Sequence, residues 1–118
     1  MEKEKYLEVL IKLIVNNWRF VKNYELLITK INPEERNNFL SKLNWYKKNL
    51  EESLNEVEIK LVSLENKKYD PGIAATALNI EDFDNNDNLI VEQMIEPIVM
   101  GSNGVIKNGL VLLKRIST

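Results

Sequence analysis

Hydrophobic residues recur at every seventh position through the first part of this sequence, and this spacing constrains the fold more than any other feature. The series is Leu7, Ile14, Val21 and Ile28. A seven-residue period is typical of a helix that packs one stripe of side chains against a partner helix. Because residues 3–30 contain neither glycine nor proline, we expect one uninterrupted helix there.

A second helix is predicted from Pro33 to Glu65, after a short joint. Asn32 is a suitable N-cap, and Pro33 suits the first helical position. The seven-residue series of this segment is Leu43, Leu50, Val57 and Leu64. Since the joint is short, the second helix should fold back on the first and form a hairpin.

The first helix is more hydrophobic than one neighbouring helix can cover. Its further apolar positions are Val9, Leu13, Val15, Phe20, Leu26 and Leu27. We therefore expect a homodimer in which two hairpins form a four-helix bundle or coiled coil, with both seven-residue series at the dimer interface. The alternative is that a sheet or loop of the same chain covers the extra face. Trp18, Trp45 and Tyr46 are expected to pack or to lie at the hairpin tip rather than to form a ligand cage.

The composition changes abruptly near Asn66. All 4 glycines and every aspartate follow it, and residues 89–100 are strongly apolar and β-branched. Pro97 should divide or bend this strand, and the Gly101–Gly104 and Asn108-Gly109 segments should form two tight turns. The predicted fold class is therefore α+β, with a long helical hairpin for dimerisation at residues 1–66. A small antiparallel β-domain, or head, for partner binding follows at residues 67–118.

Several classes of function are disfavoured by what the sequence lacks. With no Cys and no His, it offers no thiol nucleophile, no imidazole base and no Cys/His metal site, and we expect no cofactor. The net charge of −2 without a basic block argues against nucleic-acid binding. No apolar run is long enough to span a membrane, and Met1–Lys5 is not typical of a secretory signal, so we expect a cytoplasmic protein.

The acidic residues do not form a convincing catalytic or metal site. In the loop at 81–88, Asp82, Asp84 and Asn86 are spaced like calcium ligands, but Asp87 stands where the sharp turn requires glycine. Glu92 and Glu96 would lie on one face of a strand about 13 Å apart, too far for a pair of catalytic carboxylates. We therefore predict a protein that is not an enzyme and has no metal site.

The order of these parts, and three short motifs, resemble the GrpE family of nucleotide exchange factors for DnaK-type chaperones. Tyr69-Asp70-Pro71 is similar to the family's Phe-Asp-Pro, and Val91-Glu92 to its Val-Val-Glu. The segment 104–113 is similar to the final hairpin of the family. The sequence departs from the pattern at residues 72–76, where a polar segment is replaced, and at Pro97-Ile98, which replaces Gly-Tyr.

The resemblance implies a co-chaperone whose helices pair two chains and whose head binds the nucleotide-binding domain of a DnaK-type chaperone. The partner-binding residues that it implies are Glu92, Glu96, Lys107 and Leu113. The alternative function is a dimeric adaptor or scaffold that holds a partner other than a chaperone, without catalysis. Binding of the chaperone by the head distinguishes the two.

Overall fold

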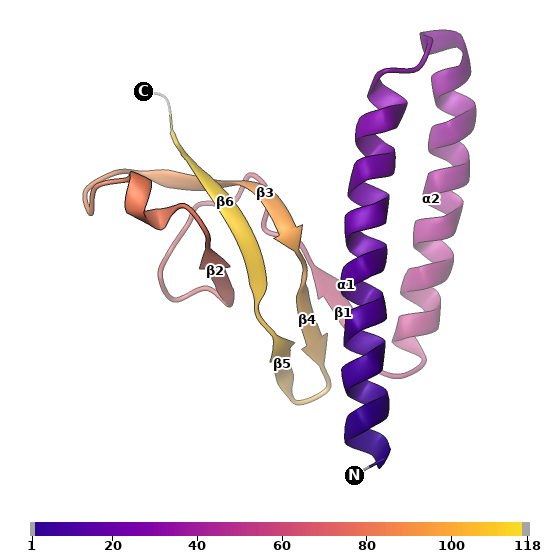
Figure 1. The fold of residues 1–118 in the computed structure, drawn as a ribbon, viewed down its shortest axis with the longest axis horizontal. Helices are drawn as coiled ribbons and strands as arrows, with labels where there is room; N and C mark the ends of the chain where they lie inside the picture. Colours follow the sequence, from indigo (N-terminus) through magenta and orange to yellow (C-terminus); the bar gives the residue numbers. More distant parts are fainter. Residues whose placement is uncertain (1, 117–118) are drawn as a thin grey trace. The chain divides into compact units, whose positions relative to one another are not determined.

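A computed structural model describes residues 2–116 and divides the chain into two compact units, one ending at Glu58 and the other beginning at Ile59 (Figure 1). The first unit consists of α1 (Glu2–Thr29) and α2 (Pro33–Asn55). The second contains six short strands and one 3-10 turn. The predicted α+β class, with a helical hairpin before a small sheet domain, is confirmed.

The joint between the helices is held by two side chains. The Asn32 side chain accepts a hydrogen bond from the Glu34 N–H at 3.2 Å, and Pro33 occupies the start of α2, as predicted. The Arg36 guanidinium donates to the carbonyl oxygens of Thr29 and Ile31, each at 3.1 Å. Because the last carbonyls of a helix have no partner inside it, Arg36 caps the end of α1 and fixes the reversal of the chain.

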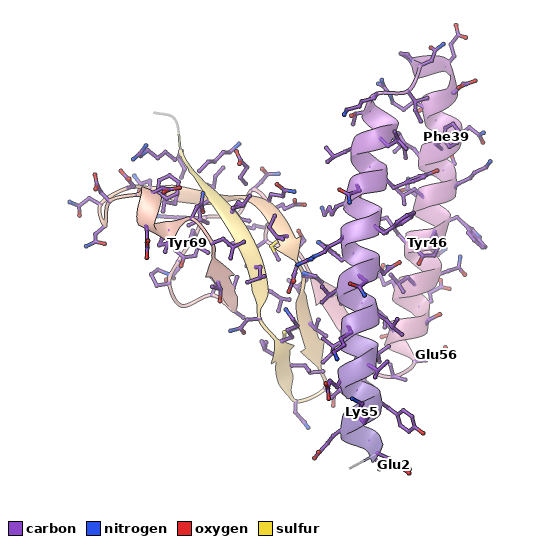
Figure 2. The ribbon with its side chains drawn as sticks, viewed as in Figure 1. Glu2, Lys5, Phe39, Tyr46, Glu56 and Tyr69 are labelled. Carbon is purple, nitrogen blue, oxygen red and sulfur yellow. The ribbon has the colours of Figure 1, made fainter. Side chains whose placement is uncertain are left out.

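The hairpin has a narrow hydrophobic core inside the single chain. Val21, Ile28 and Leu43 are buried together, and four partly buried side chains pack against them: Tyr24, Ile31, Phe39 and Leu40. Figure 2 shows the two helices side by side, with Phe39 near the joint and Lys5 and Glu56 at the opposite end of the hairpin. The α1 stripe with seven-residue spacing therefore faces α2, at least along its second half.

The second helix is shorter than predicted. It ends at Asn55 instead of Glu65, and Glu58 adopts a left-handed backbone conformation with φ 60°. The following residues form β1 (Lys60–Val62), which pairs antiparallel with β4. The seven-residue spacing of Val57 and Leu64 is therefore not helical, because pairing of this β-branched segment with a sheet overrides the local pattern. The boundary between the two units falls after residue 58, before the composition change at residue 66.

The β unit is organised around one long hairpin that bends in the middle. Its first arm is β3 (Leu89–Glu96) followed by β4 (Ile98–Gly101), and its second arm is β5 (Gly104–Lys107) followed by β6 (Gly109–Arg115). β4 pairs with β5 in one sheet, whereas β3 pairs with β6 in the other. The predicted break of the first arm at a proline is confirmed, and the predicted turn at 101–104 connects β4 to β5.

Two details of the sheets differ from the predictions. Asn108-Gly109 is not a hairpin turn, because β5 and β6 lie in different sheets and the chain passes from one to the other at Asn108. β2 (Ala75–Ala77) joins the edge of β6 in parallel, so the second sheet is mixed rather than purely antiparallel. β1 extends the first sheet beside β4, which gives two sheets of three strands each.

The core of the β unit is closed. Val91, Met94, Val99 and Val111 have no exposed surface. Register shifts follow Val91 and Met94 in β3, so its buried residues do not alternate regularly. At the bend, a Cβ atom on Gly109 would lie 3.0 Å from the Glu96 carbonyl oxygen, so only glycine fits there without displacement of its neighbours.

Candidate interaction surfaces

The largest exposed hydrophobic surface of the hairpin is a second line of residues along α1. We call it the apolar seam and define it as Tyr6, Val9, Leu13, Phe20 and Leu27. Leu13, Phe20 and Leu27 are 60%, 67% and 55% exposed. Large contiguous apolar surfaces of this kind mark interaction sites in soluble proteins.

The apolar seam and the predicted dimer interface are different sets of residues. Ile14, Val21, Ile28 and Leu43 are buried within the single chain, and three of these form the hairpin core. Of the rest, Leu7 and Val57 are exposed, Leu50 is half-buried, and Leu64 is half-buried in the β unit. The predicted surplus of hydrophobic residues on α1 is real. It lies on the neighbouring line of the helix, and the seven-residue spacing of Tyr6, Leu13, Phe20 and Leu27 was a signal that could have identified it.

Side chains of the hairpin border the apolar seam on its flank toward α2. The Tyr46 hydroxyl donates to Asn17 Oδ1 at 2.5 Å, which links the middle of α2 to the middle of α1. Phe20 stacks on Tyr24 with ring centroids 6.3 Å apart. These contacts hold Phe20 in place at the surface, so a partner would meet a fixed aromatic ring rather than a mobile one.

The exposed side of α2 carries an apolar depression lined by Ser41, Lys42, Trp45 and Tyr46. Trp45 is 68% exposed and lies in the middle of α2, so it neither packs in the core nor occupies the hairpin tip as predicted. Trp18 is half-buried, with the Lys22 ammonium 5.0 Å from its ring centroid. The depression is open and offers one cation, so we assign it no ligand.

The bend of the β unit contains a short ion pair. Lys107 Nζ lies 2.6 Å from Glu96 Oε1, and the Glu96 side chain is only 11% exposed. The same ammonium donates to the Asn108 carbonyl oxygen at 3.2 Å. Because these residues end β3 and β5, the ion pair joins the two arms of the long hairpin where both arms change sheet. Two of the predicted partner-binding residues, Glu96 and Lys107, are therefore brought together.

The other two predicted partner-binding residues lie apart from this pair. Glu92 is exposed at the first register shift of β3, whereas Leu113 is buried in the core at 2% exposure. Leu113 therefore offers no surface to a partner in this fold. Sequence reasoning did not single out Val105 and Ile106, which are 45% and 38% exposed. They are adjacent on β5, at the edge of its sheet, and their β-branched side chains there were a usable signal.

The acidic loop at 81–88 is tied to the end of β6. Asp87 Oδ2 accepts the Arg115 Nε–H at 3.1 Å and the Asp84 backbone N–H at 2.8 Å. The Arg115 guanidinium also lies 5.2 Å from the centroid of the Phe83 ring. The bond from the Asp84 N–H, with a further contribution from Arg115, holds the pKa of the Asp87 carboxyl below its ordinary value. The loop is thus a closed structure rather than a free acidic segment.

Within residues 2–116, no group of three or more metal-ligating side chains is clustered closely enough to hold an ion. In the same part of the chain, no helix combines the length and the apolar character needed to cross a membrane. The features that remain are surfaces for other macromolecules: the apolar seam of the hairpin and the β5 edge of the β unit.

Comparison with known proteins gives no assignment, since neither a family model, nor a curated protein, nor a solved structure matches this chain.

Proposed function

We propose that this chain is a GrpE-like co-chaperone, a cytoplasmic and non-enzymatic protein that promotes nucleotide release from a DnaK-type chaperone. The observation that carries the proposal is the order of parts, a helical hairpin with an exposed apolar seam followed by a closed two-sheet β unit. The hairpin pairs two copies of the chain. The β unit binds the nucleotide-binding domain of the chaperone.

The residues that carry the family resemblance occupy structured places in the β unit. Tyr69 donates its backbone N–H to the Leu89 carbonyl oxygen at 2.8 Å, which attaches the segment before β2 to the start of β3. The Asp70 side chain accepts the Gly72 N–H at 3.0 Å and closes a turn. Val91-Glu92 lies in β3, and residues 104–113 cover β5 and most of β6. These positions support a shared plan for the β unit.

The partner surface that we propose on the β unit combines Val105 and Ile106 with Glu92 and Lys107. The two apolar side chains supply surface that is removed from water on binding, and the charged groups select the partner. Glu96 keeps Lys107 in position rather than contacting the partner, because its carboxylate is buried against the Lys107 ammonium.

The mechanism requires no bond to be made or broken. A protein that binds the open form of a nucleotide cleft more tightly than the closed form shifts the population toward the open form. Nucleotide then leaves the open cleft faster. A tenfold preference for the open form corresponds to a differential binding free energy of about 1.4 kcal/mol, which a small apolar contact can supply.

The test is release of a fluorescent nucleotide from a DnaK-type chaperone of the same organism. We expect micromolar protein to accelerate release by at least about tenfold, which corresponds to the same differential free energy of binding. The double variant Val105→Asp/Ile106→Asp should lose this effect. The matched control is Leu78→Asp, at another exposed apolar position of the β unit, and it should retain the effect.

Absence of acceleration by the unaltered protein would overturn the exchange function. If the β unit then captured a protein other than the chaperone, and if Val105→Asp/Ile106→Asp abolished that capture, the chain would be a dimeric adaptor that uses the same surface.

A further inference from the structure

We infer that the apolar seam of α1 pairs with the same seam of a second copy in a parallel, in-register arrangement, and that Asn16 and Asn23 specify this arrangement. The inference rests on the pairing part of the proposed function and is independent of its exchange part. It concerns residues other than the two series first expected at the interface. The apolar seam is a continuous stripe whose partner must present the same spacing.

The spacing of the apolar seam is that of a helix–helix contact. Tyr6, Leu13, Phe20 and Leu27 are seven residues apart. Val9, Asn16 and Asn23 form the alternate line with the same period, so the two lines together repeat in steps of four and three residues. This is the pattern of knobs packing into holes of a second helix. Since a second copy presents the same spacing, the two surfaces are complementary without any further element.

The hairpin leaves this surface uncovered because its own core lies on another side of α1. Successive residues of a helix are separated by about 100°, and the buried stripe Ile14, Val21 and Ile28 is one residue ahead of Leu13, Phe20 and Leu27. The side chain of Ile14 is 3% exposed and that of its neighbour Leu13 is 60% exposed. Helix α1 therefore has two separate faces, one for α2 and one for a second chain.

Asn16 and Asn23 select the orientation of the pair. Both are exposed in the single chain and would be enclosed when two apolar seams meet. In a parallel, in-register pair each amide faces its own counterpart, and the two amides can bond to each other. In an antiparallel pair each would face an apolar residue and leave a polar group without a partner, which costs about 1–3 kcal/mol for each group. A single polar position of this kind is known to fix register in coiled coils.

The charges beside the apolar seam favour the same orientation. Lys5, Lys12 and Arg19 repeat every seven residues along its outer flank. An antiparallel pair would bring the two cationic flanks together, and like charges at that distance repel. A parallel pair places this flank against the partner's opposite flank, where Asn17 offers an amide oxygen and Tyr24 offers an aromatic face. Lys12 also pairs with Glu8 at 3.5 Å within its own chain, which lessens the repulsion without removing it.

Disulfide cross-linking tests the orientation directly, because the chain contains no cysteine. Val9→Cys and Asn23→Cys lie near the two ends of the seam, and each variant can form a disulfide only with its counterpart in a second copy. In a parallel, in-register pair both should oxidise to covalent dimers, at least about tenfold faster than the control Glu8→Cys, because the facing thiols have a high effective concentration. Glu8 neighbours Val9 but points about 100° away from it.

Each outcome decides the matter. Rapid cross-linking at both positions 9 and 23 supports the arrangement. A dimer in sedimentation that cross-links at neither position has another orientation or register, and a monomer at high concentration has no seam pairing at all; both results overturn the inference. The assay contains no chaperone, so its failure leaves the exchange function standing. Failure of nucleotide release would likewise leave this arrangement intact.

Discussion

The two units of this chain solve the problem of burying hydrophobic side chains in opposite ways. The β unit closes on itself: Val91, Met94, Val99 and Val111 are fully enclosed by two sheets. The hairpin encloses only a narrow core and leaves Leu13 and Phe20 mostly in water. An amphipathic helix with one neighbour can bury one stripe, whereas two faces of α1 are apolar. The difference teaches that the β unit is complete as a single chain and that the hairpin is complete only with a partner.

The largest effect that we expect comes from charging the apolar seam. Leu13→Glu combined with Phe20→Glu would place unpaired carboxylates in the contact between two copies, and each buried unpaired charge costs several kcal/mol. Association should weaken at least about 1,000-fold, equivalent to about 4 kcal/mol. Sedimentation over a range of concentrations measures this change.

The matched control for the charged seam is Leu78→Glu, at an apolar position of the β unit that is 57% exposed. It adds the same charge outside the seam and should leave association unchanged. Equal association of the seam variant and the control would break the comparison between the units, because the hairpin would then need no second copy.

The next largest effect concerns the closed core of the β unit. Met94→Ala removes a side chain with no exposed surface, so we expect a loss of about 2–5 kcal/mol in the free energy of unfolding of this unit. Because the cavity lies inside one chain, this loss should not depend on protein concentration. Denaturant unfolding at two concentrations measures both properties. Leu78→Ala, at an exposed position, should change stability by less than about 0.5 kcal/mol.

The same contrast explains how far the sequence could predict the molecule. The joint at Asn32-Pro33 and the hairpin turn at 101–104 follow from local chemistry, and both were predicted correctly. The end of α2 was not, because Ile59–Val62 continues the helical spacing while its pairing with β4 is a contact distant in sequence. The passage of Asn108 between two sheets was missed for the same reason.

The candidate surfaces show a related limit. Spacing alone indicated that α1 is too hydrophobic for a lone hairpin, but two neighbouring lines have the same seven-residue period. Only the course of α2 decides that Ile14 is buried and Leu13 is exposed. In the β unit, a run of apolar residues in β6 could not reveal which would face outward, and Leu113 was therefore expected at a surface although it lies in the core.

A smaller effect should follow from crowding the bend of the β unit. In Gly109→Ala the new methyl group would lie 3.0 Å from the Glu96 carbonyl oxygen and 3.1 Å from Ile98 Cγ1. We expect a loss of about 1–3 kcal/mol in the free energy of unfolding, since the surrounding strands must shift. A thermal melt monitored on the β unit measures it. Gly72→Ala is the control, because its methyl group would meet only Asp70 Oδ1 at an ordinary 3.7 Å, and an unchanged melt of G109A would show that the bend is more adaptable than the closed core.

The smallest effect should appear in the acidic loop, which is the one exposed part of the β unit whose order depends on a titrating group that we can name. The pKa of the Asp87 carboxyl is lowered, first by the Asp84 N–H and then by Arg115. A lowered pKa in the folded state means that the ionised carboxylate stabilises the closed loop at neutral pH. This contribution begins to fall as the pH drops below the ordinary aspartate value near 3.8 and is lost once the pH passes the lowered pKa. Hydrogen exchange at the Asp84 amide reports the change, because this N–H is bonded to Asp87 Oδ2. Exchange should accelerate on acidification relative to Leu113, whose N–H is bonded to the Asn79 amide oxygen, a group that does not titrate. In Asp87→Asn the Asp84 amide should be less protected at neutral pH and lose this pH dependence. Equal behaviour of the two amides in the unaltered protein would mean that the loop is held by the closed core beneath it and not by its own charges.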